Sequence, residues 1–107
     1  MELKSRTSGE KLIIDLPAEI DISNLQDIEA FVNGAGEKIK EIIFNFDEVF
    51  YIDSAGLYFL LKLNLELRKK GGSLEVHNVF GETKRIFDIS AIKDHLVVLD
   101  TLNSPAF

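Results

Sequence analysis

The sequence predicts a single α/β domain with α-helices packed on a mixed, mostly parallel central β-sheet. Short segments of alternating apolar residues are interleaved with longer segments whose apolar residues recur at helical spacing. The chain has 107 residues, the length of one domain, and no linker, repeat or low-complexity segment divides residues 1–107. The expected order is β-β-α-β-α-β-α-β. Strands that alternate with helices favour parallel pairing through right-handed crossovers.

The first half of the chain begins with a predicted hairpin. Residues 2–7 are mostly polar, which is typical of an edge strand, and a turn at Thr7-Ser8-Gly9-Glu10 leads to a second strand at 11–16 that Pro17 ends. A helix is expected from Ser23 to about Ala35. Its apolar stripe is formed by Leu25, Ile28, Phe31, Val32 and Ala35. Ser23 and Gln26 have the spacing of a capping box, in which each side chain satisfies a free backbone donor of the other residue.

The second half begins with the strongest strand pattern. In residues 41–46, Ile42 and Phe44 face one way and Ile43 the other, so this strand is expected at the centre of the sheet, covered on both faces. A connection at 47–52 precedes a second helix at about 55–70, which Gly71-Gly72 ends. The remaining predictions are a strand at 73–77, a shorter helix at about 82–88, a strand at 96–99 and a coil or frayed helix at 101–107.

Composition excludes several classes of function. The absence of cysteine removes disulfides, thiolate metal sites and a cysteine nucleophile. A formal net charge of −6 disfavours binding to nucleic acid or to an anionic membrane. The N-terminus lacks the apolar region of a secretory signal, and the most apolar helical stretch, Ala55 to Leu61, is far too short to span a membrane. A cytoplasmic location is expected.

Catalytic and metal-binding patterns are missing. His77 and His95 lie in or beside different strands and do not have the spacing of metal ligands. No serine lies in a G-x-S-x-G elbow, and no glycine-rich phosphate loop begins a helix. Asp47 and Glu48 are adjacent acids in a connection, where solvation is the simplest explanation. We therefore expect no catalytic residue, no metal site and no cofactor.

The most informative segment is Tyr51 to Leu57, which joins a buried strand to the most apolar helix. Asp53 or Ser54 is well placed as the N-cap of this helix. Gly56 is costly so early in a helix, which suggests that another backbone or a partner approaches closely. The alternative is that Asp-Ser is only a good helix start.

The same helix offers a second indication. At about 100° per residue, Lys62, Glu66, Lys69 and Lys70 fall on one arc, predicted to face solvent. Phe59 falls inside this arc, and Tyr58 lies at its border. A large aromatic residue on a polar face near Ser54 is typical of a docking surface, although a single exposed aromatic residue needs no explanation.

Three segments, in register, resemble a known family. Residues 44–57 run from a hydrophobic strand through a short acidic connection to Asp53-Ser54-Ala55-Gly56-Leu57. Ala18-Glu19-Ile20-Asp21 follows the second strand, and residues 84–92 are Lys-Arg-Ile-Phe-Asp-Ile-Ser-Ala-Ile. Together they resemble STAS domains, specifically bacterial anti-sigma factor antagonists. Ala18, Tyr58 and Ala91 stand where that family commonly has glycine.

The resemblance implies a non-enzymatic binding module that spans residues 1–107. In such antagonists a serine at the position of Ser54 is phosphorylated by an anti-sigma factor that is itself a serine kinase. The unmodified form binds this kinase and so frees the sigma factor, which regulates transcription, and a PP2C-type phosphatase restores it. The docking surface implied for this chain comprises Glu19, Asp21, Ser23, Asp53, Ser54, Gly56, Tyr58 and Phe59. A monomer is expected.

Two other functions were weighed. One is a STAS module that binds a small ligand, or that acts in a larger signalling assembly without sigma-factor control. The other is a small hydrolase or nucleotide-binding protein that uses Ser54, which the sequence disfavours because it offers Ser54 no general base and no phosphate loop.

Overall fold

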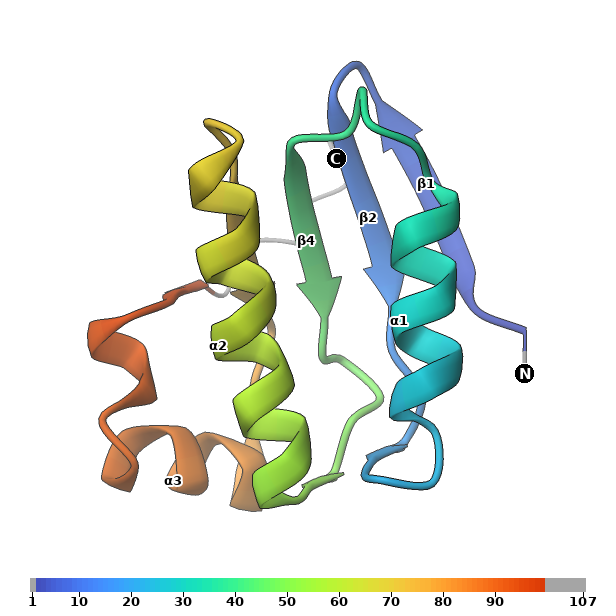
Figure 1. The fold of residues 1–107 in the computed structure, drawn as a ribbon. Helices are drawn as coiled ribbons and strands as arrows, with labels where there is room; N and C mark the ends of the chain where they lie inside the picture. The colour runs from blue at the N-terminus through green and yellow to red at the C-terminus, as the bar shows by residue number, and fades with distance from the viewer. Residues whose placement is uncertain (1, 100–107) are drawn as a thin grey trace.

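The computed structural model describes residues 2–99, apart from the side chain of Lys93, so the tail predicted at 101–107 lies outside the described residues. Figure 1 shows the main sheet with its helices. The sheet has the strand order β1-β2-β4-β6-β7, in which β1 is antiparallel to β2 and the other pairs are parallel. Its strands are β1 (Lys4–Ser8), β2 (Lys11–Asp15), β4 (Glu41–Asn45), β6 (Ser73–His77) and β7 (Val97–Leu99).

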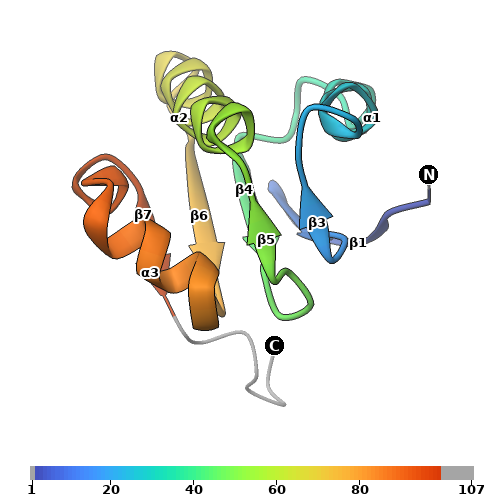
Figure 2. The same ribbon diagram turned by 90° about the horizontal axis from the view of Figure 1, so that it is seen from below.

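The helices are α1 (Leu25–Gly34), α2 (Ser54–Lys69) and α3 (Gly81–Ile89), followed by a short 3-10 turn, η1 (Ile92–Asp94). In Figure 2, α1 and α2 lie together on one side of the sheet. The predicted fold class and element order are therefore confirmed. Two features were not predicted from the sequence: η1, and a second sheet of two parallel strands, β3 (Glu19–Ile20) and β5 (Tyr51–Ile52). Within residues 2–99, no helix has the length and apolarity that a bilayer crossing requires.

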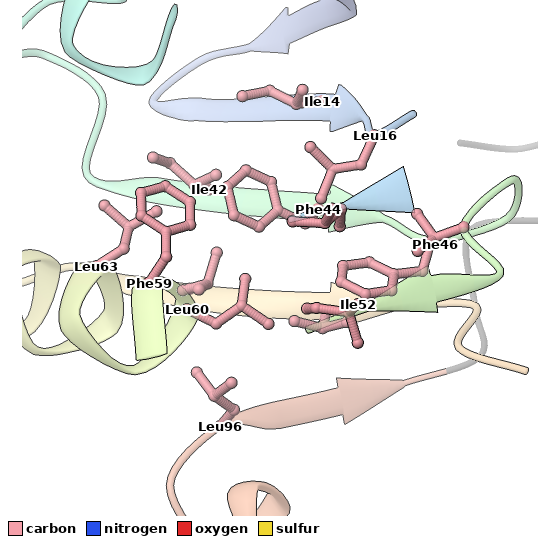
Figure 3. Packing of buried hydrophobic residues seen from close by; sticks show 14 of the residues in the cluster. Ile14, Leu16, Ile42, Phe44, Phe46, Ile52, Phe59, Leu60, Leu63 and Leu96 are labelled. Atoms are coloured by element: carbon pink, nitrogen blue, oxygen red, sulfur yellow. The ribbon is translucent and has the colours of Figure 1, made fainter. Parts of the chain in front are cut away.

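One apolar cluster fills the space between the sheet and the helices. In Figure 3, Phe44 and Phe59 face each other, and their rings stack with centroids 6.3 Å apart. Ile28 of α1, Leu60 of α2 and Phe87 of α3 belong to the same buried cluster. All three helices thus contribute to one buried core, and burial of apolar surface is the dominant stabilising term in folding.

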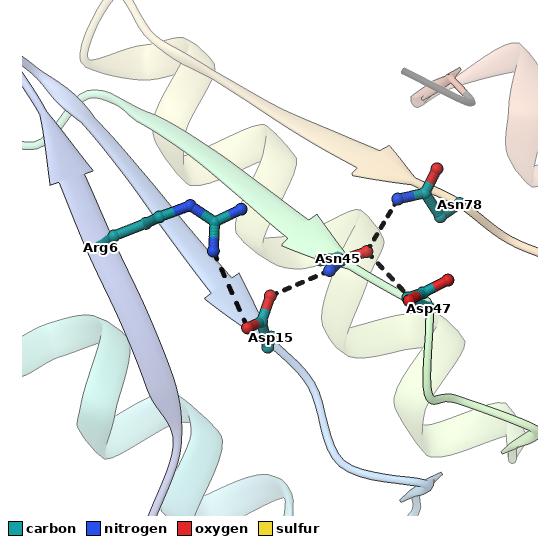
Figure 4. A network of polar contacts seen from close by, with 5 residues as sticks. All are labelled: Arg6, Asp15, Asn45, Asp47 and Asn78. Carbon is teal, nitrogen blue, oxygen red and sulfur yellow. Dashed lines mark hydrogen bonds and ion pairs between the residues drawn. The ribbon is translucent and has the colours of Figure 1, made fainter. Parts of the chain in front are cut away.

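The opposite face of the sheet is organised differently. Ile13 and Ile43, paired across β2 and β4, form a small buried cluster of their own, so the apolar side chains of β4 are buried on both faces as predicted. Beyond them a polar network joins the strand ends (Figure 4). Asn45 donates to Asp15 at 2.9 Å and accepts from Asn78 at 3.0 Å and from the backbone of Asp47 at 3.2 Å. Asn45 therefore fixes the start of the connection that leads to β5.

The helix ends follow local backbone chemistry. After α2, the backbone N–H of Gly71 donates to Arg68 and that of Gly72 donates to Leu67, the pair of bonds of a Schellman motif, and Gly71 has φ +86°. After α3, the corresponding left-handed position is occupied by Ala91, with φ 60°. An L-residue with a Cβ is strained in this region. This strain gives a physical reason for glycine at the corresponding position of the resembling family, and Ala91 carries the strain in this chain.

Replacing Ala91 by glycine removes that strain, and we expect Ala91→Gly to stabilise the fold by about 1 kcal/mol, a rise in Tm of about 5 °C. The control is Ala35→Gly, the same substitution at a residue with φ −71°. It should lower stability by at least about 0.5 kcal/mol, because it adds the entropic cost of glycine and removes a partly buried methyl group that packs against the core. Thermal unfolding of both variants is the measurement, and equal shifts in the same direction contradict the strain at Ala91.

Candidate functional site at the start of helix α2

The site is built by the pairing of β3 with β5. The two strands are parallel, with Glu19 opposite Tyr51 and Ile20 opposite Ile52. The pairing continues past the strands, because the backbone N–H of Asp53 donates to the carbonyl of Ile20 at 3.1 Å. Figure 2 shows β3 and β5 side by side, with α1 and α2 following them. The loop after β3 and the first turn of α2 are therefore neighbours, although about 30 residues separate them in sequence.

Asp53 connects this loop to the helix through its two carboxylate oxygens. It is the N-cap of α2: Oδ1 accepts the backbone N–H of Gly56 at 2.8 Å. Oδ2 accepts the backbone N–H of Ile22 at 3.2 Å. Of the two residues considered as the cap, Asp53 is therefore the one, and Ser54 becomes the first residue of the helix, with an exposed side chain.

The loop at 21–24 is further fixed by its own side chains. Asp21 accepts the backbone N–H of Ser23 at 2.9 Å and also the Ser23 hydroxyl. Asn24 accepts the backbone N–H of Asp21 at 3.0 Å and donates to the carbonyl of Glu19 at 2.7 Å. The predicted capping box is wrong: Asn24, not Ser23, is the N-cap of α1, and it makes no capping hydrogen bond. Ser23 is instead hydrogen-bonded to Asp21, the residue directly after β3.

Two exposed apolar side chains flank Ser54. The side chain of Ile22 is 79% exposed on the loop that Asp53 holds, and that of Tyr58 is 70% exposed one helical turn after Ser54. Tyr58 was expected at the border of a docking surface. Ile22 was missed, and the signal that could have found it is an isoleucine between polar residues directly after a strand, where no core position is available.

The prediction that Phe59 lies on a solvent-facing arc is wrong. Its side chain is only 8% exposed, because α1 packs beside the arc that was expected to be open. Lys62 on this arc reaches across to Glu29 of α1, with Nζ and Oε2 3.6 Å apart. Phe59 is a core residue and is not available to a partner.

Gly56 is also buried, and its close neighbours belong to this chain. A Cβ at Gly56 would lie 2.6 Å from Cγ1 of Ile52 and 3.2 Å from Cγ2 of Ile20. A close approach exists, but it is made by the side chains of Ile52 and Ile20, and not by another backbone or a partner as expected. Gly56 thus lets the first turn of α2 lie directly against the two short strands.

The chemistry available at this site is limited. Among the described residues, no side chain forms a hydrogen bond with the Ser54 hydroxyl. His77 is buried and bonds to Glu75 through Nε2 at 2.8 Å, while the carbonyl of His95 accepts from Asn64 at 2.8 Å. No three His, Cys, Asp or Glu side chains are grouped as metal ligands within residues 2–99. The arrangement offers a hydroxyl and two apolar side chains on a rigid surface.

The geometry defines a small α/β domain that presents a serine at a helix start beside a fixed loop. The family model of the STAS domain matches residues 2–104. The chain therefore belongs to the STAS domain family, and the resemblance seen in the three sequence segments is confirmed.

Individual relatives agree with this assignment. The chain is 27% identical over 81 residues to an anti-sigma-B factor antagonist of Bacillus subtilis (strain 168), an alignment that covers 76% of this chain and 74% of the relative. Its fold is similar to that of the anti-sigma factor antagonist SpoIIAA in its unphosphorylated form, with a TM-score of 0.79, 21% identity and coverage of 95% and 91% of the two chains. An anti-sigma factor antagonist from Mycobacterium paratuberculosis gives a TM-score of 0.81 at 16% identity, with coverage of 95% and 87%.

The double role of Asp53 predicts a measurable loss of stability. Asp53→Ala removes the cap of α2 and the acceptor of the Ile22 N–H together. We expect it to lower the free energy of unfolding by about 1–2 kcal/mol, measured by urea denaturation. Asp53→Asn, which keeps a side-chain oxygen for the cap, should lose clearly less. An unchanged urea midpoint for Asp53→Ala would show that neither bond contributes.

Proposed function

We propose that this protein is a phosphorylation-switched binding module, not an enzyme, and acts as an anti-sigma factor antagonist. In its unphosphorylated form it binds an anti-sigma factor that is a serine kinase, and this binding releases a sigma factor for transcription. The kinase transfers the γ-phosphoryl group of ATP to the Ser54 hydroxyl, with loss of the hydroxyl proton and release of ADP. A PP2C-type phosphatase hydrolyses the phosphoester. The module works as a cytoplasmic monomer.

One observation carries the proposal: Ser54 is exposed at the first position of α2, one turn before the exposed Tyr58 and next to Asp53, which holds the loop of the exposed Ile22. A kinase can reach such a hydroxyl, and apolar groups on a fixed loop and a helix provide contact area with little ordering cost. Glu19, Asp21, Ser23 and Asp53 belong to or hold the adjacent loop. The relationship to an anti-sigma-B factor antagonist supports the assignment of the partner class.

The position of Ser54 also explains how one phosphate could release a partner without unfolding the domain. A phosphoserine carries a charge of about −1.5 to −2 at pH 7, and the free backbone N–H groups and dipole at a helix N-terminus favour an anion. A partner packed on the same spot must desolvate that charge or bring its own acids near it. Two unit charges about 6 Å apart interact by roughly 3 kcal/mol at an effective dielectric of 20. Because about 2.7 kcal/mol corresponds to 100-fold in affinity, a single phosphate has the required magnitude.

The first test combines phosphorylation with binding. Incubated with its cognate kinase and ATP, the wild type should gain one phosphate, located by mass spectrometry at Ser54, and Ser54→Ala should gain none. Ser54→Asp should keep the wild-type urea midpoint but bind the kinase at least about 10-fold more weakly. The kinase is obtained by pull-down with the wild type and with Ser54→Asp as the comparison bait. Modification of another residue, or equal binding of the two baits, contradicts the proposal.

The second test asks whether Ile22 belongs to the docking surface. Ile22→Ala should weaken kinase binding about 10-fold, because a pre-ordered apolar side chain is lost from the contact, while stability stays within about 0.5 kcal/mol. The chain offers a matched control: Ile89, the last residue of α3, has a side chain exposed to 78%, against 79% for Ile22. Ile89→Ala should leave binding unchanged. Equal effects of the two substitutions, measured by calorimetry, would remove Ile22 from the surface.

A further inference from the structure

The outer face of α2 carries a second apolar stripe that the core does not use. Tyr58 and Leu65 are 70% and 58% exposed, and Leu61 between them is half-buried. Their spacing of three and four residues places all three within about 40° of Ser54 around the helix axis. The core face of the same helix, formed by residues such as Leu60 and Leu63, lies on the other side. The solvent side of α2 therefore has the spacing by which one helix packs against another.

A groove runs beside the second half of this stripe. It has a volume of about 550 Å³ and lies between α2 and the segment after η1. Its lining residues are Leu61, Asn64, Leu65, Arg68, Asp94 and His95. Asn64 fixes its floor, because its side chain donates to the carbonyl of His95 at 2.8 Å and accepts the backbone N–H of Leu74 at 3.1 Å. The groove is thus a firm feature of the fold, open to an apolar side chain from outside.

We infer that this outer face of α2, from Ser54 to Arg68, together with the groove beside its second half, is a docking site for an amphipathic helix of a partner protein. The face from Ser54 to Arg68 is about 21 Å long at 1.5 Å per residue, which corresponds to four turns of a partner helix, and the apolar stripe from Tyr58 to Leu65 covers about 10 Å of it. Because the face begins at Ser54, it is continuous with the proposed docking surface. Assigning the helix to the same kinase rests on the proposed function, whereas the affinity of the groove for a helix does not.

The charges at the two ends of this face specify the occupant further. Arg68 and Lys69 occupy the last turn of α2, and no ion pair engages either of them within the described residues. These two cations outnumber Asp94, the one acid among the residues that line the groove. At the other end, the carboxylates of Asp21 and Asp53 lie beside the helix start. An occupant with leucines at three- and four-residue spacing and glutamates at the end over Arg68 therefore complements the groove. The other end of this helix should carry no acid, because it faces two carboxylates.

The test uses a defined probe: a synthetic 18-residue peptide, held helical by lactam bridges, with leucines at this spacing and glutamates at one end. Titrated at low salt into the full-length ¹⁵N-labelled protein, it should shift amide signals of residues 58–68 and saturate below about 1 mM. Leu65→Ser should weaken the binding at least 10-fold, and Ile89→Ser, at a comparably exposed apolar residue on α3, should not. Replacing the glutamates of the peptide by lysines should also weaken it, and Arg68→Glu should reverse that preference.

Three results overturn the inference. The first is the absence of saturable shifts in α2. The second is equal binding by Leu65→Ser and the wild type. The third is a concentration dependence of the same amide signals without peptide, because a second copy of the chain would then be the occupant. Since the assay contains no kinase, a negative result contradicts helix binding by α2 but not the proposed phosphorylation of Ser54. Conversely, a failure of Ser54 to be phosphorylated does not contradict helix binding by α2.

Discussion

The site depends on one short stretch of backbone pairing, that of β3 with β5. Two residues on each side are paired, and the bond from Asp53 to the carbonyl of Ile20 extends the contact to the first turn of α2. Everything that makes Ser54 a plausible target for a partner follows from this pairing. It places the loop at 21–24 beside the helix start, and it sets Asp53 where its two oxygens can hold both segments. Without it, Ser54 would be an ordinary helix-start serine.

The sequence was sufficient for the fold and for the start of α2. The alternation of apolar residues in residues 41–46 and 73–77 predicts strands with buried faces. The glycines after Lys70 predict the end of the helix, because glycine readily adopts the left-handed conformation found there. The start of α2 was equally clear, because Asp-Ser before an apolar run has few other uses. Such features depend on the residue and its immediate neighbours, and sequence patterns record them.

What the sequence did not reveal depends on neighbours that are distant along the chain. β3 and β5 are two residues long, too short for a periodic pattern, so a pairing that defines the site left no local signal. Phe59 was placed on the wrong side of α2 because helical spacing alone does not say which arc a second helix covers. Ser23 has the spacing of a capping residue, yet its hydroxyl donates to Asp21 instead. In each case a tertiary contact overrides a local preference.

The two faces of helix α2 have different roles. The inner face packs in the core, and the outer face carries the candidate docking surface. The inner face is fixed by the stack of Phe59 on Phe44 and by the contact of Gly56 with Ile52, so the helix cannot shift without loss of core packing. Under the proposed function, the outer face gains or loses a charge at Ser54 while the scaffold stays in place. A switch built this way acts on the free energy of association and not on the conformation of the domain. The pinned loop at Ile22 and the stripe from Tyr58 to Leu65 share this rigid frame, so a charge at one end changes the binding of any partner that contacts both.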